Sequence, residues 1–530
     1  MVLRGRPAPE GPRRSPRGAR HQQGVRGRAG RRHGRHRRTR PHCHRRPFVT
    51  FTKGTEHDRE ALRAAREFLD EHGGAGAAAR VHELVRRNGR WRGQKCVNLI
   101  AAESPTSPAV RALLSSEIGT RASGGHIGAD SRCFPGLRHA DEVEALCVEL
   151  LKEAFGAGWA DQRMLGGMAG CMVAYTALAR PGDLMMSVPP PAGGDSSGRS
   201  DGPGGARGLR VADIPFDLDE LEVDLDAFRR EAERLRPRLV SLNQTMVLFP
   251  LPVRELKETV APWGGRLYFD GAHQAGLIAG GCHPNPLDEG ADILTGSSGK
   301  TFSGPQGGII AWNDPDLTEP VSTAIFPVLT GSHQMNRVAA LAVATAEMLE
   351  FGADYMRRTV ANARSFARSL ADQGFRVLCA NRGYTRTHQV MADVRSLGGG
   401  LAVARTLEEA NIMVNKMLLP SDPDSPDAEP GGIRIGTTEV TRLGFGAAEL
   451  DAVARLMRRA LIEREPVNRI RREVEDLRSG FQTLHYTFGT GAPRPRRPTE
   501  SAESAEPAVE PAESAESAEV AAKPSGQTSA

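Results

Sequence analysis

A single lysine stands in the middle of a run of small residues. Residues 295–308 read Thr-Gly-Ser-Ser-Gly-Lys-Thr-Phe-Ser-Gly-Pro-Gln-Gly-Gly, with Lys300 near the centre and an apolar segment on either side. Lysine is rare in this chain, in which arginine supplies most of the positive charge; the other lysines are Lys53, Lys95, Lys152, Lys257, Lys416 and Lys523. An amine that loses its proton can condense with an aldehyde, whereas a guanidinium cannot. The segment therefore indicates an imine-forming lysine, and a surface turn with a chance lysine is the alternative.

A carboxylate and a histidine precede this lysine by about thirty positions. Residues 265–276 read Gly-Arg-Leu-Tyr-Phe-Asp-Gly-Ala-His-Gln-Ala-Gly, which is a buried-strand pattern that ends at Asp270 and continues into a turn with His273. An acid at the carboxyl end of one strand and a lysine after the next strand meet in one cleft of a parallel sheet. Pyridoxal 5'-phosphate (PLP) needs this pair, because the acid keeps the ring nitrogen protonated while the lysine holds the aldehyde.

Four segments together resemble the serine hydroxymethyltransferase family. They occur in the order and spacing of that family across about residues 98–461, and they are Asn98–Pro108, Asp270–His273, Gly299–Gly308 and Gly432–Arg442. The resemblance is closer still to the L-threonine transaldolase branch. It implies an α/β protein, a fold type I PLP-dependent transferase. Its large domain would hold a mainly parallel seven-stranded sheet, and a smaller C-terminal α+β domain would follow.

The resemblance also implies roles for individual residues. Lys300 would hold PLP, Asp270 would protonate its ring nitrogen, and His273 or Thr245 would hydrogen-bond its phenolate. The remaining cofactor-binding positions that it implies are Gly166, Gly167, Met168, Asp195, Ser298, Gly331 and Ser332, the last two on a loop donated with Thr330 to the phosphate of a neighbouring subunit.

One arginine lies in a strand pattern between two isoleucines. Arg434 would be unfavourable there if it were buried without a partner, and its forked guanidinium suits a carboxylate. The prediction is that Arg434 binds the substrate carboxylate, with an internal ion pair as the alternative.

Three regions depart from the family's pattern. Residues 124–136 carry a catalytic glutamate and several tyrosines in hydroxymethyltransferases, but here His126 falls at the glutamate and Phe134 at one of the tyrosines. This departure argues against tetrahydrofolate. His126 could relay a proton to a substrate hydroxyl, or it could be a solvated loop histidine. Asp195 stands where the family places a histidine on the PLP ring, and Gly166 and Met168 replace serines, so the backbone must do more of the phosphate binding.

The elements that must position these residues follow from apolar periodicity. Short apolar runs alternate with helical patterns, which predicts a mainly parallel sheet with helices on both faces. The predicted helices include 140–155, 224–235, 336–350, 356–372, 401–410 and 448–461.

The chain of 530 residues is long enough for two or three domains. We expect an Arg-rich tail without a fold over 1–47, an N-terminal helical arm over 48–97, a large PLP-binding domain over 98–335, a small C-terminal domain over 336–465, a terminal helix over 466–489 and a low-complexity tail over 490–530. By the resemblance, the arm embraces a partner subunit in a homodimer with shared active sites. A nucleic-acid arm is the less favoured alternative for 1–47.

Composition excludes several classes of protein. The seven cysteines show no CxxC pair, so they indicate reduced thiols and a cytoplasmic protein without a metal site. No apolar run approaches the ~20 residues of a membrane span, and no secretory signal is visible. We expect neither membrane nor nucleic acid as a partner, but rather small-molecule amino acid and aldehyde substrates.

The function predicted from these features is transfer of a glycyl unit. L-Threonine would undergo retro-aldol cleavage with release of acetaldehyde, and aldol addition to a second aldehyde would give a β-hydroxy-α-amino acid. One alternative is a serine hydroxymethyltransferase that uses tetrahydrofolate. Another is a non-catalytic protein that retains the fold.

Overall fold

The computed structural model describes residues 56–423 and 429–489. The two predicted tails, 1–47 and 490–530, lie outside the described residues. The chain divides into two units, at Arg80 and Val81, and each is described by itself. In the first unit, helix α1 (Glu56–Arg90) begins and breaks at Gly73, which has φ 65° and ψ −170°. The helical arm expected over 48–97 thus contains a helix that is interrupted at Gly73.

The second unit contains a seven-stranded sheet. Its strands, in spatial order, are β2 (Trp159–Asp161), β10 (Gly308–Trp312), β9 (Ile293–Ser297), β8 (Arg266–Asp270), β7 (Leu239–Asn243), β3 (Leu184–Ser187) and β4 (Arg210–Asp213). Strands β9, β8, β7, β3 and β4 run parallel, whereas β10 is antiparallel to both of its neighbours. The prediction of an α/β protein with a mainly parallel seven-stranded sheet is confirmed.

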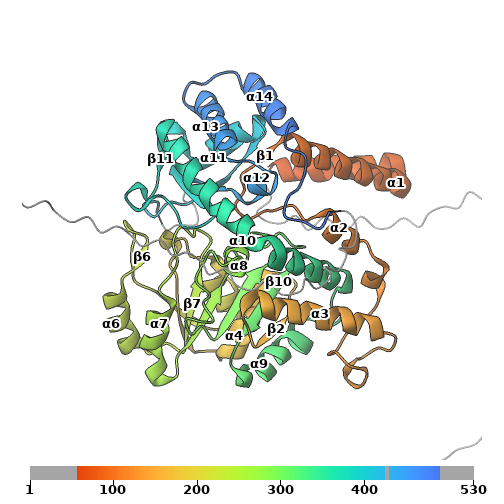
Figure 1. Ribbon diagram of the computed structural model, residues 1–530, viewed down its shortest axis with the longest axis vertical. Helices are drawn as coiled ribbons and strands as arrows, with labels where there is room; N and C mark the ends of the chain where they lie inside the picture. Colours follow the sequence, from red (N-terminus) through yellow and green to blue (C-terminus); the bar gives the residue numbers. More distant parts are fainter. Residues whose placement is uncertain (1–55, 424–428, 490–530) are drawn as a thin grey trace, which may run out of the picture. The chain divides into compact units, whose positions relative to one another are not determined.

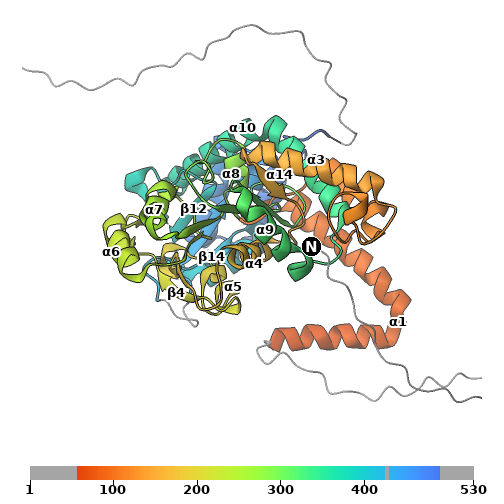
Figure 2. The same cartoon turned by 90° about the horizontal axis from the view of Figure 1, so that it is seen from below.

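Helices cover both faces of this sheet, and successive residues along each strand therefore enter different cores. Tyr268 of β8 packs into a core with helix α4 (Gly167–Leu178), while Leu267 and Phe269 pack into the core on the other face. In Figure 2, α4 lies on one side of the sheet and α3 (Arg138–Phe155), α8 (Ala275–Ala279) and α10 (Met335–Asp372) lie on the other. Burial on both faces explains why these strands read as continuous apolar runs.

A smaller sheet forms the core of the C-terminal part. Its antiparallel strands are, in spatial order, β11 (Arg376–Val377), β12 (Gln389–Asp393), β15 (Gly432–Gly436) and β14 (Asn415–Met417). Helices α11 (Gly399–Glu409), α13 (Ala447–Leu461) and α14 (Val467–Ser479) accompany it (Figure 1). The terminal helix expected over 466–489 ends at Ser479, and the described chain continues without regular structure to Gly489.

The long helix α10 joins the elements around the two sheets. The sequence suggests separate helices over 336–350 and 356–372, but α10 runs unbroken through Gly352. A Cβ placed on Gly280 would lie 2.6 Å from the carbonyl oxygen of Gly352, and Gly280 directly follows α8. Gly352 therefore allows a close approach to α8 rather than ending the helix, which is the reason the pattern is misleading.

The remaining elements connect these layers. They include the π-helical turns Trp91–Lys95 and Ala324–Leu329, several short 3-10 helices, β1 (Val97–Asn98), α2 (Pro108–Leu114), α5 (Pro203–Ala206), β5 (Phe216–Asp217), β6 (Glu222–Val223), α6 (Leu225–Leu235), α7 (Val253–Val260), α9 (Thr318–Thr323), β13 (Ile412–Met413) and α12 (Thr438–Arg442). Among the described residues, no helix has both the length and the apolar character that a bilayer crossing requires.

Candidate active site

Asp270 and Lys300 lie together at the carboxyl edge of the large sheet. Asp270 ends β8, and Lys300 follows the end of the adjacent parallel strand β9 by three residues. Burial raises the pKa of Asp270, and the ammonium of Lys300 lowers it again. Burial lowers the pKa of Lys300, while the charge of Asp270 raises it. The structure therefore brings the predicted acid and the predicted lysine into one buried cluster.

This environment suits an amine that must react as a nucleophile. Loss of solvation favours the uncharged form of Lys300, which is the form that attacks a carbonyl. The ionisable groups that act on Lys300 are Asp270, Arg434 and Asp195, which were predicted to belong to the site, and Cys171, which was not.

Arg434 lies on β15, and its guanidinium is buried among neutral acceptors. Its Nη1 donates to the carbonyl oxygen of Thr245, and its Nε donates to Oδ1 of Asn415 at 3.2 Å. Burial lowers the pKa of Arg434 to about 10, and the charge of Asp195 opposes this shift. No ion pair with Arg434 occurs within the described ranges 56–423 and 429–489. A buried cation held by neutral groups can accept a substrate carboxylate as its counter-charge.

His273 is buried against Arg434 and another histidine. Its Nε2 lies 3.3 Å from Nη1 of Arg434, and its ring stacks on His388 with centroids 5.7 Å apart. Because Nε2 faces a donor, the proton of the neutral ring belongs on Nδ1. This nitrogen makes no well-aligned hydrogen bond among the described residues, although the backbone of Ala101 lies close enough to raise the pKa of the ring. Burial, followed by the charges of Lys300 and Arg434, holds the pKa of His273 well below its ordinary value. An available Nδ1–H fits the phenolate oxygen of PLP.

Thr245 and Asp195 lie on two loops that are joined by hydrogen bonds. The hydroxyl of Thr245 donates to the carbonyl of Gly193 at 3.3 Å. The carboxylate of Asp195 accepts from the backbone N–H of Ser197 at 2.8 Å, and its carbonyl accepts from Nδ2 of Asn243 at 3.0 Å. Since Asp195 acts on the pKa values of Lys300 and Arg434, its carboxylate belongs to the same site.

Open space lies in front of the glycines predicted to bind phosphate. Gly166 precedes α4 and Gly167 opens it, and a Cβ on either would meet no heavy atom within 4 Å. The free N–H groups and dipole at this helix end suit a phosphate. Met168, in the first turn, is 48% exposed. The positions at the start of α4 therefore leave room for a ligand rather than filling it.

The loop with Thr330, Gly331 and Ser332 is largely exposed. Gly331 and Ser332 face solvent, whereas the buried Oγ1 of Thr330 has no hydrogen-bond partner among the described residues. Ser298 is fully buried, and its hydroxyl donates to the carbonyl of Pro305 at 2.6 Å. The hydroxyl proton of Ser298 is therefore engaged in a hydrogen bond within the protein, and a cofactor-binding role of Ser298 stays a prediction.

His126 lies apart from this cluster within one protomer. Its ring is exposed, and Nδ1 lies 3.4 Å from Nη1 of Arg163. It borders a separate pocket of about 290 Å³ with Asp161, and it is not among the groups that shift the pKa of Lys300. Partial burial and Arg163 lower the pKa of His126, so the ring is neutral near pH 7. Its role as a proton relay stays a prediction.

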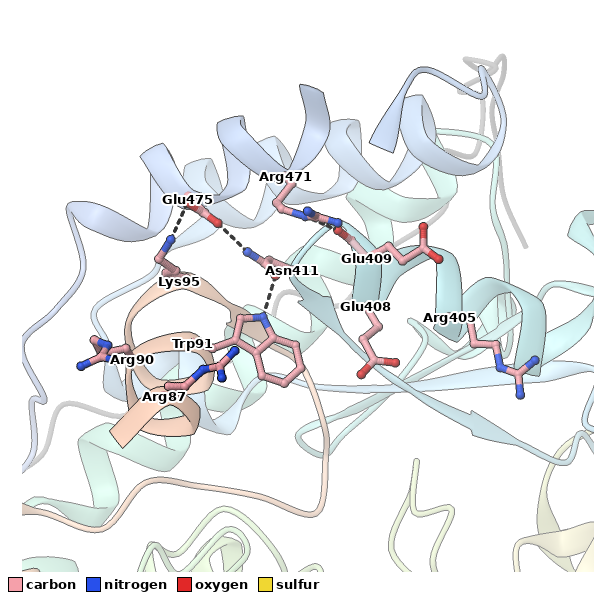
Figure 3. Close-up of a pocket in the computed structure, with 10 residues that line it drawn as sticks. All are labelled: Arg87, Arg90, Trp91, Lys95, Arg405, Glu408, Glu409, Asn411, Arg471 and Glu475. Atoms are coloured by element: carbon pink, nitrogen blue, oxygen red, sulfur yellow. Dashed lines mark hydrogen bonds and ion pairs between the residues drawn. The ribbon is translucent and has the colours of Figure 1, made fainter. Parts of the chain in front are cut away.

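A further pocket of about 610 Å³ lies beside α14 and contains none of the predicted site residues (Figure 3). Its lining residues are Arg87, Arg90, Trp91, Lys95, Arg405, Glu408, Glu409, Asn411, Arg471 and Glu475. Several of these groups bind one another: Lys95 forms an ion pair with Glu475 at 3.1 Å, and the indole N–H of Trp91 donates to Asn411. The lysine, the acid and the arginine predicted for catalysis all lie outside this pocket.

Sequence reasoning missed three groups that contact the predicted ones, of which Cys171 and His388 are buried and Asn415 is half-buried. Asn415 holds Arg434, His388 stacks on His273, and the thiol of Cys171 donates to Asp270. Asn415 and His388 reach the site only through packing of the small sheet, which the sequence does not reveal. Cys171 carried a weak signal, since it lies one helical turn after the glycine pair.

Comparisons with known proteins cover most of the chain. The family model for serine hydroxymethyltransferase matches residues 77–457. The serine hydroxymethyltransferase of Methanopyrus kandleri is 43% identical over 414 residues, covering 78% of this chain and 96% of that relative. The serine hydroxymethyltransferase of Korarchaeum cryptofilum is 40% identical over 427 residues, covering 78% and 98%.

A solved structure shares the fold across most of the chain. The crystal structure of L-threonine transaldolase from Pseudomonas fluorescens, in its internal aldimine state, superposes with a TM-score of 0.71 at 25% identity, covering 81% of this chain and 96% of that one. Such enzymes are PLP-dependent, and the available Nδ1 of His273, the buried Asp270, the half-buried Lys300 and the open glycine pair fit that cofactor. The chain belongs to the serine hydroxymethyltransferase family of fold type I PLP-dependent transferases.

Proposed function

We propose that the protein transfers a glycyl unit from L-threonine to a second aldehyde. The observation that carries the proposal is the loop 124–136, which holds neither a glutamate nor a tyrosine. The groups that folate-dependent hydroxymethyl transfer would use there are replaced by His126 and Phe134. An acceptor that is itself an aldehyde needs no folate. The similarity to an L-threonine transaldolase structure supports the same reaction.

Different residues of the cluster bind the substrate and the cofactor. Arg434 grips the carboxylate of L-threonine, and Asn415 and the carbonyl of Thr245 fix the guanidinium from behind. This grip orients the Cα–Cβ bond for cleavage. The amine of Lys300 is the anchor for the cofactor, and Asp270 keeps a proton on the ring nitrogen. PLP, when bound, supplies an electron sink beside Cα. His273 donates Nδ1–H toward the phenolate oxygen.

The proton of the β-hydroxyl needs an acceptor. His126 is neutral and could take it, but it lies apart from Lys300 within one protomer. We propose that His126 acts across the interface of a homodimer, where the exposed loop with Gly331 and Ser332 also completes the phosphate site of the partner. This proposal rests on the exposure of both loops in the single chain.

A second candidate function is serine hydroxymethyl transfer with tetrahydrofolate. The observation in its favour is the 40–43% identity to archaeal relatives that carry this name. The two functions differ in whether folate is needed, which a direct assay decides.

The test incubates the PLP-loaded protein with L-threonine and an aromatic aldehyde, without folate. We expect acetaldehyde and a new β-hydroxy-α-amino acid in equal amounts, detected by mass spectrometry. Lys300→Ala is the control and should give no product. Turnover only with L-serine and tetrahydrofolate would overturn the proposal in favour of the second candidate. A protein that gains no cofactor absorbance with PLP would favour a non-catalytic role.

A further inference from the structure

Cys171 is a buried cysteine of α4, one helical turn after Gly167. It is 1% exposed and lies in the core on the α4 face of the large sheet, together with Tyr268 of β8. Asp270 lies two residues beyond Tyr268 on the same strand, so its side chain leaves the sheet on the same face. The helix that opens with the glycine pair therefore also places a thiol beside the acid.

A chain of three hydrogen bonds ends on Asp270. The hydroxyls of Thr295 and Tyr268 lie 2.6 Å apart, the Tyr268 hydroxyl donates to Sγ of Cys171 at 3.3 Å, and the Cys171 thiol donates to Oδ2 of Asp270 at 3.3 Å. Tyr268 has one proton and gives it to the sulfur, so Thr295 must be the donor toward Tyr268. Every proton in the chain thus points toward the carboxylate.

The other oxygen of Asp270 is held by the backbone. Oδ1 accepts from the N–H of Ala272 at 3.0 Å, so each carboxylate oxygen has one protein donor. The charged groups that act on Asp270 are Lys300, which favours its ionised form, and Asp195, which disfavours it. Burial raises the pKa of the Cys171 thiol well above its usual range, so the thiol keeps its proton and remains a donor.

We propose that Cys171 is a positioning residue that holds the carboxylate of Asp270 in one orientation and in its ionised form, with Tyr268 and Thr295 behind it. The inference rests on the proposed role of Asp270 at the ring nitrogen. A thiol is a weaker donor than a hydroxyl. It therefore orients Asp270 while leaving more basicity on the carboxylate than a serine at this position would leave.

The test compares Cys171→Ala and Cys171→Ser. In the alanine variant Asp270 loses a donor, so its pKa should rise and the acid limb of the pH profile of kcat/KM should move to higher pH. PLP affinity, measured by titrating the apoprotein and following cofactor fluorescence, should fall about tenfold, which is about 1.4 kcal/mol. In the serine variant the stronger donor should move the acid limb to lower pH, with PLP affinity within about twofold of the wild type. Tyr268→Phe should act in the same direction as Cys171→Ala, but less.

Cys147→Ala is the matched control. Cys147 is a fully buried cysteine of α3, and no hydrogen bond of its thiol is found in the described part of the chain. Its loss should lower the unfolding temperature without changing PLP affinity or the pH profile. Wild-type affinity and pH profile in Cys171→Ala, or equal changes in Cys147→Ala, would overturn the inference. Wild-type PLP affinity and turnover in Asp270→Asn would instead refute the proposed role of Asp270, so the two failures are distinguishable.

Discussion

Two buried arginines, Arg434 and Arg442, differ in their partners, and this difference predicts how their removal should change the stability of the protein. Arg442 pairs with the buried carboxylate of Glu347 at 3.0 Å, whereas Arg434 is held by the neutral oxygens of Thr245 and Asn415. If Arg434 is kept for a substrate carboxylate, Arg434→Gln removes a desolvated charge from the unliganded protein and should leave its stability within about 1 kcal/mol. Arg442→Gln leaves Glu347 uncompensated and should cost about 3–5 kcal/mol.

The two variants should rank in the opposite order in activity, with the larger loss in Arg434→Gln. A forked guanidinium gives a carboxylate two charge-assisted hydrogen bonds of about 1.5–3 kcal/mol each, so Arg434→Gln should lower kcat/KM for L-threonine by about 10²–10⁴-fold. The assay measures retro-aldol release of acetaldehyde over a range of L-threonine concentrations, with unfolding in urea followed in parallel. If Arg434→Gln kept the KM for L-threonine and lost as much stability as Arg442→Gln, Arg434 would be a structural residue and the reasoning would fail.

Three further predictions concern the surroundings of the site. Burial raises the pKa of Glu439 to about 7, above its value in the unfolded chain, so this carboxyl weakens the fold as pH rises from about 4.5 through 7. Glu439→Gln should therefore stabilise the protein by about 1–3 kcal/mol at pH 8 and hardly at all at pH 4, and equal urea midpoints at pH 8 would contradict this. Gly167→Val fills open space, so it should leave the unfolding temperature of the apoprotein unchanged but weaken PLP binding at least tenfold by fluorescence titration; unchanged affinity would move the phosphate elsewhere. Asp195→Asn removes a charge that raises the pKa of Lys300, so the pH midpoint of the absorbance of bound cofactor should shift downward, and an upward shift would refute the placement of Asp195.

Asp270 and Lys300 could be predicted as a pair because each follows a strand pattern that is visible in the sequence. The run ending at Asp270 and the small residues around Lys300 predict adjacent parallel strands, and in the structure β8 and β9 are neighbours. The residues at the ends of parallel strands gather at one carboxyl edge of the sheet, so little tertiary information was needed. The same holds for Arg434, which alternates with isoleucines in β15.

The contacts that refine the site could not be predicted in this way. Cys171 meets Asp270 through packing of α4 on the sheet, at a sequence separation of 99 residues. His388, which directly precedes β12 of the smaller sheet, stacks on His273 at a sequence separation of more than one hundred residues. The sequence places His126 in a loop and no more, because glycines specify a turn but not the direction it takes. It also divides helix α10 in two, because Gly352 acts through a partner helix that is remote in sequence.

The unbroken course of α10 has a mechanical consequence. Its 38 residues form a rod about 57 Å long that connects the parts around both sheets, and its one glycine is wedged against α8. A continuous helix without a hinge resists rotation of the smaller sheet. The strand with Arg434 is therefore held at a fixed distance from Lys300 before a substrate binds. The fixed distance between Arg434 and Lys300 would then determine selectivity, because it favours substrates with a carboxylate and an amine on the same carbon.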